Sequence, residues 1–191
     1  MKPVIAIVGR PNVGKSTFFN KVAGRKISIT ENRPGVTRDR ITVDCEWRAR
    51  PFTLIDTGGI ELKSEDTMWK EIAVQAKAAV ELADVILFFT DGREGLTSSD
   101  YDVADYLRRS KKPVVLVVNK VDEYSPDKLF EFYSLGLGEP YAVSSEHSRG
   151  IGDVLDTAVV FLPNGESPQD RSFNIAGVGN PKPAKVSSSK K

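Results

Sequence analysis

An apolar run of strand length, PVIAIV at residues 3–8, leads directly into GRPNVGKST. Gly9, Gly14, Lys15 and Ser16 have the spacing G-x4-G-K-S, which is typical of a phosphate-binding loop (P-loop) between a strand and a helix. A helical pattern follows from Lys15 to about Ala23, so the loop has the context that it requires. The alternative interpretation is an ordinary glycine turn before a helix. Of all patterns in the chain, this one restricts the fold most.

The residue types in this loop fit phosphate binding. Gly14 permits a backbone conformation that a side chain would obstruct, so consecutive N–H groups can point at phosphate oxygens. The following helix adds its positive N-terminal end. We expect Lys15 to act as a point charge on the β- and γ-phosphates, and the Ser16 hydroxyl to ligate Mg²⁺. The residues predicted to line the phosphates are Gly9, Arg10, Pro11, Asn12, Val13, Gly14, Lys15, Ser16 and Thr17.

The rest of the chain alternates apolar runs of strand length with amphipathic helical patterns. This alternation predicts an α/β fold with a mostly parallel sheet of six strands and helices on both faces. Two runs joined by RARP predict a hairpin, and hence one antiparallel edge strand. The predicted strands are 3–8, 41–47, 52–56, 85–90, 113–119 and 141–144, the predicted helices are 15–23, 68–82, 98–109, 127–135 and 150–161, and residues 24–40 are predicted to form a long loop.

Composition limits the chain to one domain of ordinary size. Its 191 residues are 40% hydrophobic and 28% charged, which allows a core and a polar surface. The net charge of +1 gives no argument for a DNA or membrane surface, and no apolar run reaches the length of a bilayer span. A single cysteine, Cys45, and an N-terminus without the pattern of a signal peptide favour the cytoplasm.

The sequence DTGG ends the second strand of the predicted hairpin. Asp56 is placed to hold Mg²⁺ in the outer coordination sphere, and the Gly59 N–H to contact a γ-phosphate. On its own, Asp-x-x-Gly is a common turn. Beside a P-loop it indicates a second part of the same site.

The sequence NKVD at 119–122 ends another predicted strand and has the chemistry of base recognition. The Asp122 carboxylate can accept hydrogen bonds from both the N1–H and the exocyclic amine of guanine. Adenine lacks this donor pair and would leave the carboxylate unpaired, which is costly. We expect Asn119 to brace the loop and Lys120 to lie across the base. The alternative is a surface turn that caps the next helix.

The sequence SSEH at 144–147 follows a further strand. Ser144, Ser145 and Glu146 could offer backbone N–H groups to the guanine carbonyl. His147 is the one histidine of the chain, and a lone histidine in a loop gives no basis for a catalytic role.

The order of these motifs is similar to that of the translation-factor-like P-loop GTPases. GRPNVGKST, PGVTRDR, LIDTGGI, FYSLGLGEP and SSEHSRGI together resemble the N-terminal G domain of the Der (EngA) family, bacterial GTPases of large-ribosomal-subunit assembly. The resemblance spans residues 3–162. It implies the P-loop GTPase fold, GTP or GDP as ligand, Mg²⁺-dependent hydrolysis of GTP to GDP and phosphate, and the large ribosomal subunit or its precursor as the partner of the whole family protein.

The resemblance also implies roles for single residues. Thr37 would be the switch threonine that binds Mg²⁺ and senses the γ-phosphate, and residues 25–41 and 57–69 would be the switch segments. The glutamine that orients water in Ras-like enzymes is replaced by Ile60, which cannot do so. Asn12 matches a P-loop asparagine that helps to bind K⁺ in similar enzymes. The residues expected to carry catalysis are Lys15, Thr37, Gly59 and Asn12, with K⁺ at Asn12 as a hypothesis.

Near the C-terminus, IAGVGNPKPAKVS repeats part of IAIVGRPNVGKST, but without the loop glycine and the Mg²⁺-binding hydroxyl. We therefore expect one working site, with a G domain at 1–162, a linker at 163–172 and a tail at 173–191 that resembles a degenerate, truncated start of a second G domain. Two functions remain open. The chain is either a GTP-hydrolysing switch domain or a binding module that reads the nucleotide with negligible hydrolysis.

Overall fold

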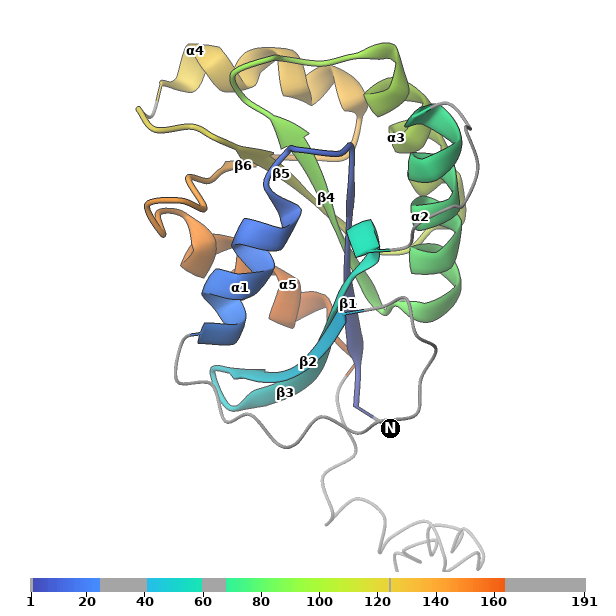
Figure 1. Cartoon of the computed structure of the whole chain (residues 1–191), viewed down its shortest axis with the longest axis vertical. Helices are drawn as coiled ribbons and strands as arrows, with labels where there is room; N and C mark the ends of the chain where they lie inside the picture. Colours follow the sequence, from blue (N-terminus) through green and yellow to red (C-terminus); the bar gives the residue numbers. More distant parts are fainter. Residues whose placement is uncertain (1, 25–40, 60–67, 124, 164–191) are drawn as a thin grey trace, which may run out of the picture.

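The computed structural model describes residues 2–24, 41–59, 68–123 and 125–163. Within them, one six-stranded sheet has the order β2-β3-β1-β4-β5-β6 and is surrounded by helices (Figure 1). This confirms the predicted α/β fold. The strands are β1 Val4–Gly9, β2 Ile41–Trp47, β3 Arg50–Asp56, β4 Val85–Asp91, β5 Val114–Asn119 and β6 Pro140–Ala142, the α-helices are α1 Lys15–Gly24, α2 Met68–Leu82, α3 Ser98–Ser110, α4 Pro126–Leu129 and α5 Ile151–Phe161, and the 3₁₀ helices are η1 Thr57–Gly59 and η2 Phe130–Leu135.

Strand direction determines where the loops lie. β2 pairs antiparallel with β3, and the other neighbouring strands pair parallel, as predicted. β1 is central, with Ile5 opposite Leu54 of β3 on one side and Val85 of β4 on the other. Because parallel strands end at the same edge of a sheet, the loops after β1, β3, β4, β5 and β6 meet at one edge.

The β2–β3 turn is shorter than the RARP loop that the sequence predicted. β2 ends at Trp47 and β3 begins at Arg50, which leaves only Arg48 and Ala49 between them. Their φ angles are 49° and 60°, the left-handed pair that a two-residue type I′ turn requires. Neither residue is the asparagine or glycine that marks such turns, so the sequence lacked the usual signal.

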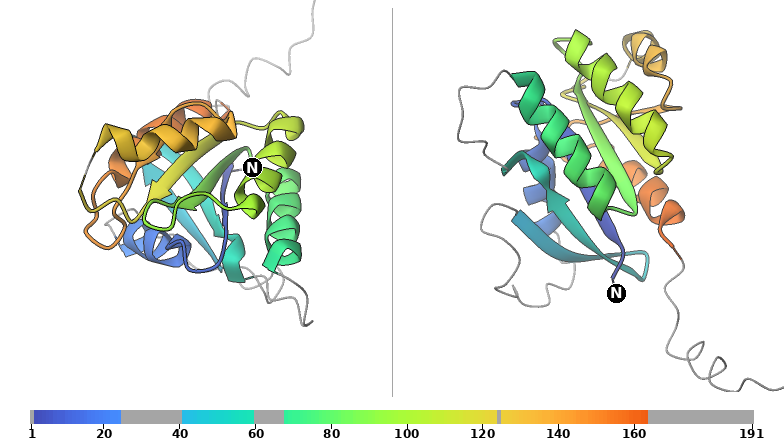
Figure 2. Two further views of the ribbon diagram at one scale, coloured as in Figure 1. Left: turned by 90° about the horizontal axis from the view of Figure 1, so that it is seen from above. Right: turned by 90° about the vertical axis from the view of Figure 1, so that its right-hand side faces the viewer.

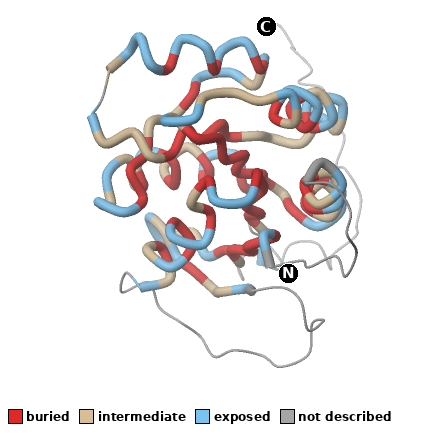
Figure 3. Tube along the Cα trace, turned by 45° about the horizontal axis from the view of Figure 1, so that its top comes forward, coloured by how far each residue is buried: buried red, intermediate tan, exposed pale blue. Residues whose placement is uncertain are grey.

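The core consists of two apolar clusters of side chains, and helices lie on both faces of the sheet (Figure 2). Phe18, Phe19 and Val22 of α1 pack with α5 on one face. Ile72 and Ala76 of α2 pack with α3 and η2 on the other. The central strands β1, β4 and β5 are buried almost throughout, whereas β2 is mostly half-buried or exposed (Figure 3). β4 is buried along its whole length, as its uninterrupted apolar sequence predicts for a central parallel strand.

The predicted helix 127–135 is wrong in type. Its first turn is α4, which begins at Pro126, and the rest is η2. Leu129, Phe132 and Leu135 are buried and three residues apart, and this spacing places them on one face of a 3₁₀ helix, which has three residues per turn. The core thus selects the tighter helix.

The last predicted strand, 141–144, is shifted. β6 occupies Pro140–Ala142 and pairs with Leu116–Val118 of β5. Ser144 instead exchanges backbone hydrogen bonds of 3.1 and 3.0 Å with Arg149. This bridge closes residues 144–149 into a loop, so the strand cannot continue.

Several sequence predictions fall outside the described residues. They are Thr37, Ile60, most of the predicted switch segments 25–41 and 57–69, all but the first residue of the predicted linker 163–172, and the predicted tail 173–191. Among the helices that the structure describes, none is both long and apolar enough to cross a lipid bilayer.

Candidate nucleotide-binding site

The P-loop lies between the C-terminal end of β1 and the start of α1. Asn12 and Gly14 both have positive φ, 65° and 93°, so the backbone curls into a cradle ahead of the helix. A Cβ atom on Gly14 would lie 2.1 Å from Nδ2 of Asn119. Glycine is therefore favoured at position 14 for two reasons. The backbone has a left-handed φ angle, and the Asn119 side chain at the end of β5 lies too close for a Cβ atom. Of its neighbours, Pro11 and Asn12 are exposed, and Val13 is buried in the core.

Lys15 is a buried cation inside this cradle. Its side chain is folded over the loop, and Nζ donates to the carbonyl oxygens of Gly9 at 2.6 Å and Arg10 at 2.7 Å. Burial lowers the pKa of Lys15 to about 8, although the Asp56 and Glu71 carboxylates act in the opposite direction. An anion at the loop would favour the protonated lysine, because an opposite charge stabilises the charged form.

Ser16 and Asp56 meet beside the cradle. The Ser16 hydroxyl donates to Oδ2 of Asp56 at 3.0 Å, and Oδ1 of Asp56 accepts the Gly58 N–H at 2.9 Å. A Cβ on Gly58 would lie 2.8 Å from Cε of Lys15, so the absence of a side chain lets η1 approach the lysine. The predicted γ-phosphate contact, Gly59, is the last residue of η1. The DTGG loop therefore lies against the P-loop, as its order in the sequence suggested.

The Ser16 hydroxyl and the Asp56 carboxylate are oxygen groups of the kind that bind Mg²⁺. Magnesium is usually held by one or two protein oxygens together with substrate phosphates, not by a cage of side chains. Consistent with this, no cluster of three or more histidine, cysteine or acidic side chains occurs in the described part of the chain. These two residues fit the ion, and the third predicted ligand, Thr37, lies outside the described residues.

Asn119 joins the P-loop to the loop after β6. Its Nδ2 donates to the Val13 carbonyl at 2.8 Å, and its Oδ1 accepts from both the N–H and the hydroxyl of Ser145, at 3.0 and 2.9 Å. Asn119 and Ser145 are both buried. The Asn119 amide thus links the phosphate cradle to the loop after β6. The NKVD motif predicts a bracing position of this kind for Asn119.

The base-reading end of the site is a small cavity of about 130 Å³. Asp122 accepts the Ser144 hydroxyl on Oδ1 at 2.9 Å and pairs with Arg93 through Oδ2. Arg93, followed by Ser144, lowers the pKa of Asp122 below its ordinary value, so the carboxylate is ionised at neutral pH. The cavity is lined by Gly14, Thr17, Arg93, Asn119, Lys120, Asp122, Ser144, Ser145 and Glu146.

Eight of the seventeen predicted nucleotide residues line this cavity, and two of the seventeen, Lys120 and Arg10, make side-chain contacts that the sequence did not predict. Nζ of Lys120 pairs with Asp91 at 2.5 Å at the end of β4. Arg10, predicted as a phosphate residue, is buried and turned to α3, where Nε donates to Oδ1 of Asp100 at 3.0 Å. Its contribution to the cradle is its backbone.

The loop from β4 to α3 was missed by the sequence reasoning, although it supplies three site contacts. Asp91 holds Lys120, Arg93 holds Asp122, and Glu94 contacts Arg10 at 3.1 Å. One signal was present in the sequence. Thr97 and Asp100 have the spacing of a capping box, which the structure shows at the start of α3.

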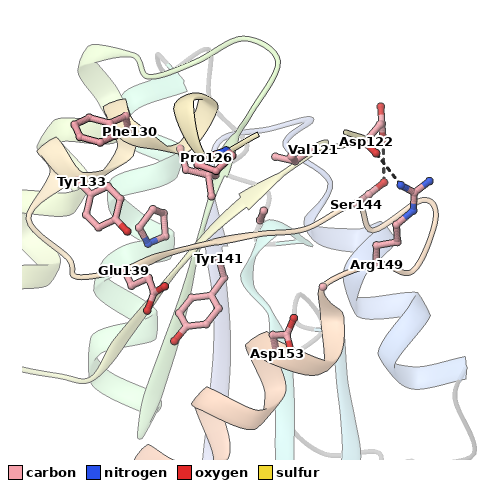
Figure 4. A pocket seen from close by; sticks show the side chains of 14 residues that line it. Val121, Asp122, Pro126, Phe130, Tyr133, Glu139, Tyr141, Ser144, Arg149 and Asp153 are labelled. Atoms are coloured by element: carbon pink, nitrogen blue, oxygen red, sulfur yellow. Dashed lines mark hydrogen bonds between the residues drawn. The ribbon is translucent and has the colours of Figure 1, made fainter. Parts of the chain in front are cut away.

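A larger cleft of about 770 Å³ lies between α4, η2, β6 and the start of α5. Figure 4 shows Asp122, Ser144 and Arg149 at one end and Phe130 and Tyr133 at the other. The two cavities share Asp122 and Ser144. The smaller one contains the predicted base-reading groups and is lined by Gly14 of the P-loop.

Comparisons with known proteins agree with this geometry. Among curated relatives, GTPase Der of Clostridium tetani is 53% identical over 189 residues, which are 97% of this chain and 43% of that protein. The chain thus spans less than half the length of the curated relatives it matches first. Among solved structures, a single-residue variant of Era from Aquifex aeolicus bound to GDP.AlF4⁻ has a TM-score of 0.67 and 30% identity, covering 89% of this chain and 61% of that one.

A second Era structure, in complex with MgGDPNP and nucleotides 1506–1542 of 16S ribosomal RNA, has a TM-score of 0.64 and 31% identity over 89% of this chain and 61% of that one. The family model described as 50S ribosome-binding GTPase matches residues 4–120, from the first strand to the base-reading loop. That match covers more than half of the chain, and so the chain belongs to the 50S ribosome-binding GTPase family, in keeping with its predicted resemblance to Der.

Proposed function

We propose that this chain binds GTP and GDP and hydrolyses GTP, and that it acts as the switch domain of a factor that assembles the large ribosomal subunit. One observation carries the proposal. Asn119 hydrogen-bonds Val13 of the P-loop and the Ser145 loop at once, and so joins the loop that precedes the buried Lys15 to the loop whose Ser144 contacts Asp122.

The base end favours guanine. Asp122 is ionised and acceptor-only, so it can take both the N1–H and the exocyclic amine of that base. Adenine presents an acceptor at N1 and would face the carboxylate without a donor pair. A site built in this way rejects the analogue that lacks the hydrogen-bonding groups, because its polar group is then left unpaired.

The phosphate end favours a di- or triphosphate. The P-loop amides and the N-terminus of α1 supply donors, and Lys15 supplies the charge. Ser16 and Asp56 would hold Mg²⁺, which supplies charge neutralisation at the β- and γ-phosphate oxygens when it is bound. By the family resemblance, the Gly59 amide would hold a γ-phosphate and Thr37 would complete the metal site.

K⁺ dependence is the finer part of the proposal. Phosphoryl transfer needs extra positive charge as the leaving group departs, and many GTPases obtain it from an arginine. In this chain the P-loop arginine, Arg10, is committed to Asp100 and Glu94. Asn12 is exposed at the rim of the cradle, and its side-chain oxygen is a suitable ligand for a monovalent cation. K⁺ beside Asn12 would supply the charge.

The ribosomal partner is proposed from the family. Its description names 50S ribosome binding, and the Era relative was solved with ribosomal RNA. We also propose that the G domain ends at residue 162, because Leu162 is buried and its carbonyl accepts a 3.0 Å hydrogen bond from Arg50. The linker 163–172 and the tail 173–191 remain proposals from the sequence.

Phosphate release tests the proposal. The chain is incubated with GTP and Mg²⁺ in KCl and, separately, in NaCl of equal ionic strength, while GDP and ADP affinities are measured by calorimetry. We expect tight GDP binding, no measurable ADP binding, and multiple turnovers that are faster in KCl. Asn12→Ala should bind GDP normally and lose the KCl advantage.

Each outcome separates one part of the proposal. Binding of ADP as tight as that of GDP would overturn the guanine assignment. GDP binding without turnover in either salt would replace the enzyme with the alternative, a nucleotide-reading module. An unchanged KCl advantage in Asn12→Ala would remove the role of that residue alone.

A further inference from the structure

The β4–α3 loop, residues 92–97, contacts both ends of the candidate nucleotide site. Asp91, the last residue of β4, accepts the backbone N–H groups of Arg93 and Glu94 at 2.8 and 3.1 Å, so the start of the loop is fixed. Glu94 and the Gly95 carbonyl hold the P-loop residue Arg10, at 3.1 and 3.2 Å. Arg93 reaches the opposite way and pairs with Asp122.

The Arg93 guanidinium pairs with the Asp122 carboxylate, which is the group that guanine would bind. Oδ1 of Asp122 accepts from Ser144 and Oδ2 from Arg93, so both oxygens are engaged. The two guanine donors need the outward-facing lone pairs of the same carboxylate. A base in the cavity and Arg93 on Oδ2 therefore compete for one group.

The Arg93 side chain can separate from Asp122 and pair with it again. Its side chain is 61% exposed while its backbone is held, so the guanidinium can swing from a fixed point. A second carboxylate, Glu146, lies near enough to act on the charge of Arg93, and both residues line the base cavity. Glu146 thus offers an alternative partner when Asp122 is taken by a base.

We propose that Arg93 competes with guanine for Asp122, and thereby weakens guanine-nucleotide binding and speeds release. The inference rests on the guanine-nucleotide binding proposed above. Exposed ion pairs are weak, so the competition amounts to about a two- to fivefold effect on affinity. An effect of this size adjusts exchange without preventing binding.

The test compares Arg93→Ala with the parent chain, using GDP with Mg²⁺ for affinity and a fluorescent GDP for release. We expect Arg93→Ala to bind GDP about two- to fivefold more tightly, with most of the gain in slower release. Arg93→Lys keeps the charge and should stay close to the parent. Arg109→Ala removes an exposed arginine paired with Asp105 on α3, and controls for the loss of one positive charge.

A double-mutant cycle locates the effect. Asp122→Asn converts the acceptor to an amide that suits xanthine, so the Asp122→Asn chain is measured with xanthosine diphosphate. Adding Arg93→Ala should then change affinity by less than about 1.5-fold, since the ion pair no longer exists. In the parent background, raising the salt should shrink the Arg93→Ala effect.

Weaker or unchanged GDP binding in Arg93→Ala would overturn the proposal, because competition requires tighter binding. An equal gain with xanthosine diphosphate in the Asp122→Asn background would also overturn it, by placing the action of Arg93 at the phosphates. A parent chain that binds no guanine nucleotide would overturn the proposed function as well, whereas normal binding by the parent with no gain in Arg93→Ala removes only this inference.

Discussion

At the phosphate end of the site the charge that faces the ligand is buried, since Lys15 is only 6% exposed, whereas at the base end the Asp122 side chain is 35% exposed and its partner Arg93 is 61% exposed. Charges interact far more strongly when water is excluded. In the proposed function, the phosphate end therefore supplies affinity. The base end would select guanine, and the partly exposed ion pair there can be exchanged at low cost.

Replacement of Lys15 should break this division most severely. Lys15→Met keeps the length of the side chain but removes its charge. We expect GDP affinity to fall about 10- to 150-fold, because a hydrogen bond to a charged group contributes about 1.5–3 kcal/mol and GDP presents only the β-phosphate of the two that Lys15 would contact. Calorimetry measures the loss. Lys77→Met, an exposed site on α2, should bind GDP like the parent, and a loss below tenfold in Lys15→Met would show that affinity resides elsewhere.

Removal of Asn119 should break the connection between the two ends. Asn119→Ala deletes three buried hydrogen bonds and leaves the Val13 carbonyl and the Ser145 N–H without this partner. We expect the free energy of unfolding to fall by about 2–4 kcal/mol, measured by urea denaturation without nucleotide. Asn20→Ala on the exposed side of α1 serves as control. An equal loss of unfolding free energy in the two variants would mean that the Asn119 hydrogen bonds do not stabilise the nucleotide-free chain.

The pH dependence of GDP binding should sharpen the comparison with a smaller effect. Burial lowers the Lys15 pKa from 10.5 to about 8, so the nucleotide-free chain loses part of this proton above pH 8. Bound phosphates favour the charged form, and binding should therefore take up about 0.1 proton at pH 7 and about 0.8 at pH 8.5. Calorimetry in buffers of different ionisation enthalpy measures the uptake.

The control for this uptake is Lys15→Met, in which the rise with pH should vanish. Without nucleotide, stability should increase from pH 8 towards 10.5 through Lys15, because the unfolded lysine binds more protons than the folded one in that window. An uptake that does not change with pH would show that Lys15 keeps an ordinary pKa in the folded chain.

Much of the site could be predicted because its chemistry is written in short local motifs. Gly14, Lys15 and Ser16 lie in one loop, and their roles follow from spacing and from the strand before them. Asn119 and Asp122 could be identified because base reading needs particular groups. The fold followed from the alternation of apolar strands and amphipathic helices, which a covered parallel sheet requires.

What could not be predicted depends on contacts between distant parts of the chain. Arg10 pairs with Asp100, ninety positions away, and Arg93 with Asp122, twenty-nine positions away. No local pattern marks either pair. The left-handed turn at Arg48 and Ala49 was missed because its residues are unusual for that turn, although Arg48 gains two hydrogen bonds to Asp156 of α5. Such partners appear only when the tertiary structure is known.

Asp100 uses its two carboxylate oxygens for separate purposes. Oδ2 accepts the N–H and the hydroxyl of Thr97 and closes the cap of α3, while Oδ1 holds Arg10 of the P-loop. Both contacts depend on one side chain, so a substitution at position 100 bears on both. Asparagine would preserve the cap but leave Arg10 with Glu94 as its remaining carboxylate partner, and glutamate would preserve the charge but not the cap geometry. The stability of the α3 cap and the position of the P-loop arginine therefore depend on the same side chain.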